Sequence, residues 1–171
     1  VAKWTANSYK ATYNANGGSV SSSNKNYTYD ANYTLLEPTR TGYEFLGWST
    51  SSTATISTYE AGDTLAVSGN VTLYAVWKAA TTLSMSTTYS AGINFANQEV
   101  YYAFTPASSG TYTFESTGSV DSKIYLYNSS GTELGNDDDS SDEGTNFKLT
   151  MNLTGGIKYF IKVRAYSTNT G

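Results

Sequence analysis

The sequence predicts a mainly β protein, and three of its properties indicate this fold class. Aromatic residues make up 15% of the 171 residues and Tyr alone occurs 16 times, which suits half-buried strands whose rings pack while the hydroxyls stay hydrated. The chain has only two Pro and many short alternating runs bounded by Ser, Thr, Asn and Gly. No segment shows the longer apolar period of an amphipathic helix, so helices are not expected to dominate.

The first part of the chain, residues 5–78, is a series of short strand-like runs separated by turns. From Tyr9 to Tyr13 apolar and polar residues alternate, which predicts a half-exposed strand. Asn and Gly in residues 14–18 tolerate positive φ and predict a turn. Further apolar runs follow at residues 27–36, 43–48 and 71–77. Pro38 excludes a helix between the first two of these runs.

Four segments of this part have the order of a known repeat: YNANGG, EPTRTGYEFLGWST, YEAGDTL and NVTLYAVW. Together they resemble one copy of the Listeria–Bacteroides repeat, the internalin B-type repeat of bacterial surface proteins. The resemblance covers residues 5–78 and implies a small β-grasp-like domain used in tandem on secreted or wall-attached proteins. Residues 1–4, VAKW, are similar to the end of the same unit, so they are expected to be the tail of a preceding repeat.

Two Trp residues of this part have two interpretations. Trp48 and Trp77 could be platforms for stacking sugars, or they could fill the core of a small domain. Both lie in apolar strand patterns, which favours the core. Trp77→Ala is therefore expected to unfold the first domain.

The second part of the chain, residues 83–171, follows a short joint at residues 79–82 and alternates more regularly. Two-faced runs occur at residues 100–105, 111–115, 124–127, 147–153 and 159–166. Each run is bounded by Gly, Ser, Pro or Asn. Short strands of this spacing predict an antiparallel β-sandwich.

Three segments of the second part, VYYAFTPASSGTYTFES, VDSKIYLYNSSGTELGNDDD and NFKLTMNLTGGIKYFIKVRAY, are similar to the bacterial pre-peptidase C-terminal domain. The resemblance covers residues 81–171. It implies a jelly-roll-like sandwich attached to secreted enzymes and surface proteins. Such domains usually end in a further Tyr-containing strand, so we expect the sandwich to lack its last strand or to take it from another segment.

Several function classes are disfavoured by composition. The chain has no Cys and no His, which excludes disulfides, thiolate and His-ligated metal sites, and a Ser-His-Asp triad. A net charge of −4 disfavours a nucleic-acid partner. No apolar run approaches the roughly 20 residues of a membrane span. Glycosidase chemistry needs two carboxyl groups held in a cleft, and a run of adjacent acids does not provide that. The sequence therefore predicts a protein that is not an enzyme.

An acidic segment lies at residues 136–144, between two predicted strands. Clustered carboxylates in a loop with Ser and Gly offer the oxygen ligands that Ca²⁺ prefers. The alternative is a solvated acidic loop that discourages aggregation of a strand edge. The candidate calcium ligands are Asp121, Asp137, Asp138, Asp139, Asp142 and Glu143.

Outward aromatic residues of the second part predict attachment to a ligand. The candidates are Tyr101, Tyr125, Tyr127 and Tyr166. The partner expected from them is a polysaccharide, or a host or cell-wall polymer, bound by a non-catalytic adhesion module of a secreted or cell-surface bacterial protein. One alternative is a purely structural spacer or stalk that presents another domain, and another is an accessory fragment of a secreted hydrolase. The expected location is extracellular or cell-wall attached, as a monomeric piece of a larger chain.

Overall fold

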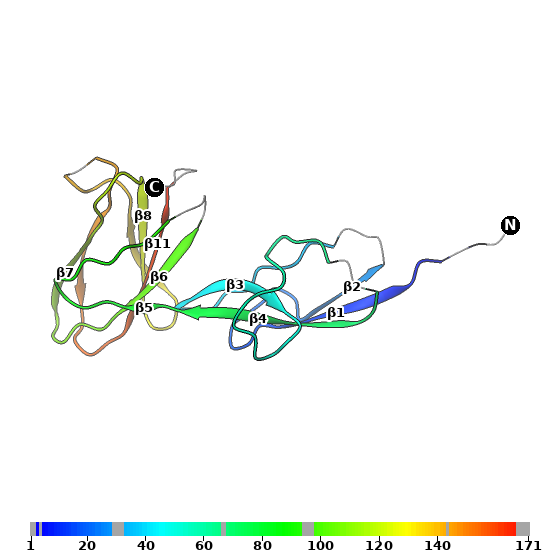
Figure 1. Ribbon diagram of the computed structural model, residues 1–171. Coiled ribbons are helices and arrows are strands. Elements are labelled where there is room, and N and C mark those ends of the chain that lie inside the picture. The colour runs from blue at the N-terminus through cyan, green and yellow to red at the C-terminus, as the bar shows by residue number, and fades with distance from the viewer. Residues whose placement is uncertain are drawn as a thin grey trace. The chain divides into compact units, whose positions relative to one another are not determined.

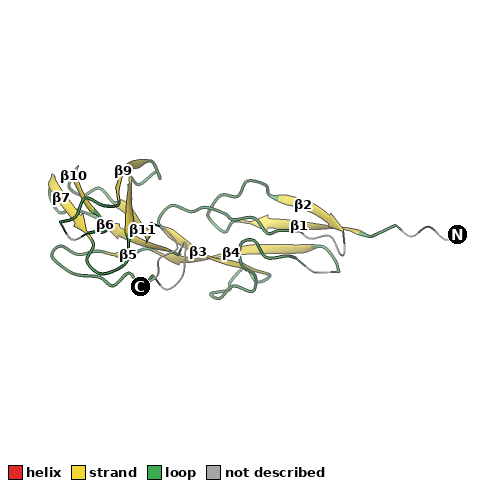
Figure 2. Cartoon of the chain, turned by 90° about the horizontal axis from the view of Figure 1, so that it is seen from above, coloured by secondary structure: helices red, strands yellow, loops and turns green. Residues whose placement is uncertain are grey.

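The prediction of a mainly β protein is confirmed by a computed structural model that describes residues 3, 5–28, 33–65, 68–93, 98–142 and 144–166. These residues form eleven strands and no helix (Figure 2). The chain divides into two compact units. The first comprises Val1–Arg40 and Phe45–Lys78, and the second comprises Thr41–Glu44 and Ala79–Gly171. Each unit has a separate cluster of buried apolar side chains.

The first unit is built on a four-stranded sheet in the order β2-β1-β4-β3 (Figure 1). Its strands are β1 (Ser8–Asn14), β2 (Asn24–Thr28), β3 (Tyr43–Ser49) and β4 (Val71–Ala79). β1 pairs antiparallel with β2 and parallel with β4. Parallel strands need a long connection between them, and the chain between β1 and β4 provides it. The central parallel pair with further strands at both edges matches the β-grasp-like sheet expected from the resemblance.

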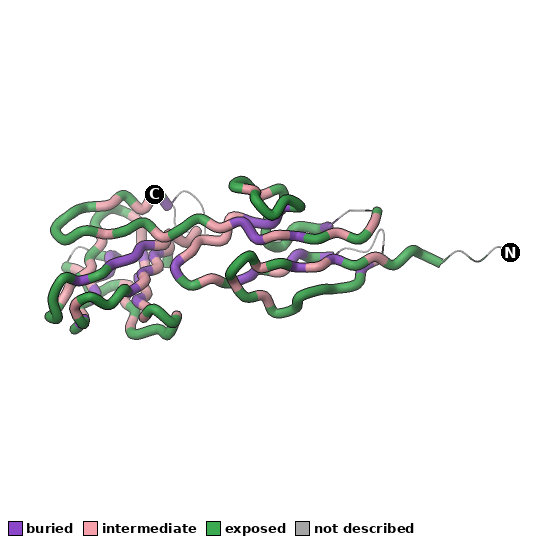
Figure 3. Tube along the Cα trace, turned by 90° about the horizontal axis from the view of Figure 1, so that it is seen from below, coloured by how far each residue is buried: buried purple, intermediate pink, exposed green. Residues whose placement is uncertain are grey.

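The core of the first unit follows the alternation of its strands, visible as buried segments along the chain in Figure 3. Ala11 and Tyr13 on β1 are buried while their neighbours are more exposed. Trp48 is fully buried, and its Nε1 donates a hydrogen bond to the Leu36 carbonyl at 2.7 Å. Trp77 is only partly buried and packs at the margin of the same cluster. Of the two Trp residues, Trp48 is therefore the more deeply buried and is the one that belongs to the core of this unit.

Gly47, just before Trp48, has a backbone that other residues rarely adopt. Its φ is +128°, and a Cβ placed there would lie 2.3 Å from the Tyr59 carbonyl oxygen. The close approach exists because Trp48 N–H donates to that same oxygen at 2.7 Å. In the GYEFLGW segment, Gly47 therefore allows the close approach to the Tyr59 backbone, and the next residue, Trp48, fills the core.

The second unit consists of two sheets with a shared core, in the sandwich-like arrangement expected. The larger sheet has the order β5-β6-β11-β8-β9 and the smaller one pairs β10 with β7. The strands are β5 (Thr81–Thr82), β6 (Glu99–Phe104), β7 (Gly110–Glu115), β8 (Ser122–Tyr127), β9 (Glu133–Asp137), β10 (Lys148–Leu153) and β11 (Tyr159–Ala165). Inward residues such as Leu126 and Ile161 meet the inner face of the smaller sheet. The pairings are antiparallel except that of β5 with β6.

Within residues 79–82, expected to be a joint, Ala79, Thr81 and Thr82 lie in strands and Ala80 lies between them. Ala79 ends β4, and Thr81 and Thr82 pair in parallel with Tyr102 and Ala103. Thr is β-branched and suits a strand, which fits the pairing of Thr81 and Thr82 in the larger sheet of the second unit. The predictions of a repeat tail at residues 1–4 and of a missing last strand fall on positions that, apart from Lys3, lie outside the described residues.

Candidate ligand-binding face

The face of the larger sheet that points away from the core carries the candidate binding residues. Along β8 and β11, buried residues alternate with half-buried ones. The register places Lys162 between Tyr101 and Tyr125, and Arg164 between Glu99 and Lys123. We call this surface the outer face. It comprises Glu99, Tyr101, Lys123, Tyr125, Tyr127, Lys162 and Arg164.

The four predicted Tyr residues lie on or beside the outer face. Tyr125 and Tyr127 are half-buried and stacked, with ring centroids 6.5 Å apart and an interplanar angle of 19°. The Tyr101 hydroxyl donates to the Glu99 carboxylate at 2.6 Å. Tyr166, which follows β11, is 51% exposed, and the Lys123 ammonium lies 5.7 Å from its ring centroid. The structure thus brings together side chains from three strands that are distant in sequence.

Three cations surround the Tyr125 ring, and the sequence interpretation did not include them. The Lys162 and Lys123 ammonium groups lie 4.8 and 5.5 Å from the ring centroid, and the Arg164 guanidinium carbon lies 5.6 Å from it. Cations at such distances are attracted to the face of an aromatic ring. The alternation of Lys162 and Arg164 with the apolar residues of β11 was a sequence signal for their outward position. The outer face is therefore both aromatic and cationic.

Two of these cations are balanced by carboxylates. Lys162 Nζ lies 2.9 Å from Glu99 Oε1, and Lys123 Nζ lies 3.7 Å from Asp138 Oδ2. Burial alone would lower the pKa of Lys162, but its hydrogen bond to Glu99 and the charge of Glu99 outweigh it, so the pKa is raised. Burial raises the pKa of the Tyr127 hydroxyl, although the charge of Lys162 acts against it. Lys162 therefore keeps its positive charge at neutral pH.

Phe160 points to the same side of the sheet as Tyr127 but is covered. Its register partners are Ala103 on β6 and Tyr127 on β8. Gly42, a residue of the same unit, lies so close that a Cβ there would be 2.3 Å from the Phe160 ring. Phe160 is therefore not counted in the outer face.

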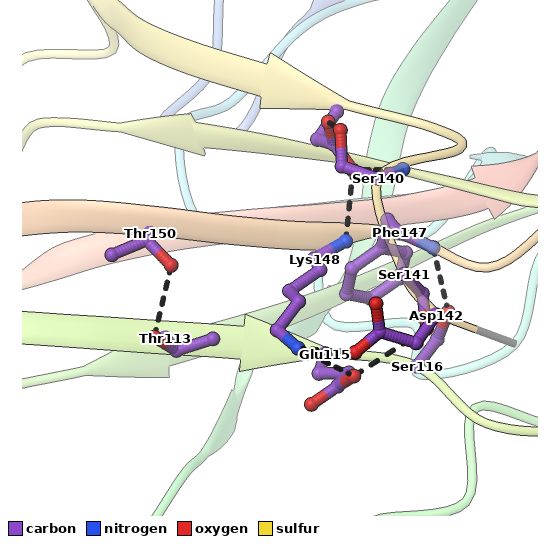
Figure 4. A network of polar contacts seen from close by, with 10 residues as sticks. Thr113, Glu115, Ser116, Ser140, Ser141, Asp142, Phe147, Lys148 and Thr150 are labelled. Carbon is purple, nitrogen blue, oxygen red and sulfur yellow. Dashed lines mark hydrogen bonds and ion pairs between the residues drawn. The ribbon is translucent and has the colours of Figure 1, made fainter.

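The acidic segment uses most of its carboxylates in local contacts. Asp137 accepts hydrogen bonds from the Ser140 hydroxyl at 2.5 Å and from the backbone N–H of Lys148 at 2.8 Å. Burial would raise the pKa of Asp137, but these bonds outweigh it and hold the pKa below its ordinary value. Lys148 Nζ lies 3.4 Å from Asp142 and 3.5 Å from Glu115 (Figure 4). The segment is thereby attached to β7 and β10.

A calcium site is favoured by one feature of this region. Within the described residues, no group of three or more acidic side chains is placed to hold a metal ion, and Glu143 lies outside those residues. Oδ1 of Asp121, however, is buried and has no hydrogen-bond partner. Burial raises the pKa of Asp121, and the charges of Asp139 and Asp138 raise it further. A cation beside Asp121 would relieve this cost, and calcium binding stays a prediction.

Asp121→Asn separates the two interpretations of the acidic segment. Folding raises the pKa of Asp121 above its unfolded value of about 3.8. At a pH below that unfolded value the carboxyl is neutral and costs no stability. At a pH above the folded pKa it is charged, and its charge destabilises the fold. We therefore expect the variant to melt higher than the parent at pH 7 in excess chelator. In calcium the parent should gain stability by mass action, and the variant should lose that gain. A parent melting temperature that is equal in calcium and in chelator would contradict the calcium prediction.

Residues 9–76 match the family model of the Listeria–Bacteroides repeat domain, which confirms the resemblance for the first part of the chain. Domains of this family occur in bacterial surface and extracellular proteins, and the first unit is similar to them over the matched residues. The matched range is less than half of the chain, and the resemblance of the second part to the pre-peptidase C-terminal domain stays a prediction. No curated protein and no solved structure matches the chain. In the part of the chain that the structure describes, no helix has the length and apolar character to cross a membrane.

Proposed function

We propose that the chain is a non-catalytic, extracellular bacterial module that attaches to a polysaccharide through the outer face of its second unit. The first unit supports an extracellular role, because its repeat family occurs on surface proteins. The lack of His and Cys leaves few groups for acid–base or nucleophilic catalysis. Attachment therefore fits the chain better than chemistry.

The stacked pair Tyr125 and Tyr127 is the observation that carries this proposal. Both rings are half-buried and are held on a strand paired on both sides, so they lose little conformational freedom on binding. Rigid aromatic surfaces contact the apolar face of a sugar ring at low entropic cost. The polar hydroxyls and cations around the rings supply the hydrogen bonds that fix a sugar's orientation.

The second candidate function is a spacer, and the repeat match favours it. Domains of the matched family repeat along surface proteins, where one copy can extend the chain without binding anything. In this case the Tyr residues of the outer face would serve cross-strand packing only. The two functions differ in one measurable property, retention on a polymer.

The double variant Tyr125→Ala with Tyr127→Ala tests the proposal. We expect the parent chain to be retained on an immobilised polysaccharide panel and the variant to bind at least about tenfold more weakly, a change of about 1.4 kcal/mol. Affinity electrophoresis and a glycan array measure this loss.

Tyr74→Ala is the matched control, because Tyr74 is a half-buried strand Tyr of the first unit. It should leave retention unchanged. Circular dichroism must show that both variants keep the fold. A parent chain that no polysaccharide retains would favour the spacer, and hydrolysis of any polysaccharide by the chain would contradict both candidates.

A further inference from the structure

Arg164 is the cation of the outer face that has no anionic partner among the described residues. Its Nε is buried and makes no hydrogen bond. Its guanidinium carbon lies 5.6 Å from the Tyr125 ring centroid. Lys162 and Lys123, by contrast, each form an ion pair with a carboxylate. Among the described cations of the outer face, Arg164 is therefore the one whose positive charge no carboxylate compensates.

The strand register explains why no carboxylate of the outer face satisfies Arg164. Its neighbour on β6 is Glu99, whose Oε1 contacts Lys162 at 2.9 Å and whose Oε2 accepts from Tyr101 at 2.6 Å. Its neighbour on β8 is Lys123, which carries the same charge. Like charges directly opposite each other destabilise a strand pair. Arg164 therefore lies between an occupied carboxylate and a second cation.

An oxyanion is the chemical group that would satisfy this arrangement. A guanidinium offers a planar set of N–H donors that matches the oxygens of a carboxylate or phosphate. A half-buried site strengthens such a contact, because water screens it less than on an open surface. The Tyr125 ring beside the guanidinium gives a surface for the sugar that carries the oxyanion.

We propose that the outer face recognises an anionic polysaccharide, with Arg164 binding an oxyanion of the polymer and Tyr125 contacting the adjacent sugar ring. The inference rests on the proposed polysaccharide attachment and names the substrate class of that face. Because Lys123 is paired with Asp138, the electrostatic attraction comes from Arg164, and it falls as salt is raised. The oxyanion is either the carboxylate of a uronic acid or the phosphate of a wall polymer, since both present the same chemistry.

The test compares Arg164→Gln with the parent chain on three polymers: polygalacturonate, a poly(glycerol phosphate) teichoic acid and a neutral β-glucan. We expect the parent to bind at least one of the two anionic polymers in a salt-dependent manner, and the polymer retained identifies the source of the oxyanion. Arg164→Gln should weaken that binding at least about tenfold. Lys158→Gln removes the same charge from an exposed loop position and should weaken the binding less than about twofold.

Each remaining outcome is decisive. Equal losses in Arg164→Gln and Lys158→Gln would overturn the role of Arg164 and indicate a charge effect without a site. Retention on the neutral β-glucan alone, lost in the Tyr125 and Tyr127 double variant, would overturn the inference and leave the proposed function intact. Retention on no polymer would overturn both. If Arg164→Gln does not fold, Arg164→Lys is the deciding variant, because it keeps the charge and removes the planar donors, so unchanged binding would overturn bidentate recognition.

Discussion

Trp48→Ala is expected to unfold the first unit while the second unit stays folded. Trp48 is 0% exposed, and its ring centroid lies 4.8 Å from that of Tyr13 and 5.4 Å from that of Phe45. Truncating such a residue removes its packing and leaves a cavity, at a cost of about 3–5 kcal/mol. The Leu36 carbonyl also loses its indole donor. A domain of this size has about 5–15 kcal/mol of stability at most, so the loss is large.

Thermal unfolding by differential scanning calorimetry measures this effect, because the units can be followed as separate transitions. Ile56→Ala is the matched control, since Ile56 belongs to the same unit and is 80% exposed. It should shift the melting temperature by no more than about 2–4 °C, as surface substitutions change stability by about 0.5 kcal/mol or less. Trp77→Ala, expected from the sequence to unfold the unit, should instead fall between the two, because Trp77 is only partly buried. A Trp48→Ala variant that melts with the parent would show that the core of this unit is elsewhere.

The strands of the chain could be predicted from local pattern, and the reason is visible in the register. Residues along β8 and β11 alternate because one face of each strand lies on the core and the other points outward. Which face a residue occupies can therefore be read from its own residue type. Pairing between strands is not local. The parallel pairing of β1 with β4 joins residues about sixty positions apart, and only the family resemblance implied it. The pairing of β5 with β6 had no sequence signal of its own.

The candidate site was predictable in its aromatic residues and not in its charges. The four Tyr residues could be named because large outward aromatics are conspicuous in an alternating strand. That Lys162 and Glu99 pair, while Arg164 has no anionic partner among the described residues, depends on which strands are neighbours and in which register. The same holds for the acidic segment. Asp137 was expected as a calcium ligand, but its oxygens accept hydrogen bonds from Ser140 and Lys148, contacts that only the folded loop creates.

Leu126→Ala is expected to destabilise the second unit by about 2–5 kcal/mol. Leu126 is 0% exposed and lies on β8, which is paired on one side with β11 and on the other with β9. A central strand between two fixed neighbours cannot move inward to fill the space that the truncation leaves, so the cavity persists. The melting transition of the second unit should therefore fall by roughly 10 °C or more, at about 4–8 °C per kcal/mol for a domain of this size.

Leu134→Ala makes the same chemical change on the neighbouring strand β9, where the side chain is 40% exposed. Because it removes little buried area and leaves no closed cavity, we expect a loss of no more than about 1 kcal/mol. The two variants differ in burial and not in the atoms removed, so the difference between their melting temperatures measures the packing of Leu126 against the inner face of the sandwich. Equal losses in both variants would contradict the register of β8, because a shift by one residue would exchange Leu126 with its outward neighbours Tyr125 and Tyr127. The inward side chain of Leu126 and the outward position of the Tyr pair are consequences of one register, so this measurement also tests the geometry on which polysaccharide binding depends.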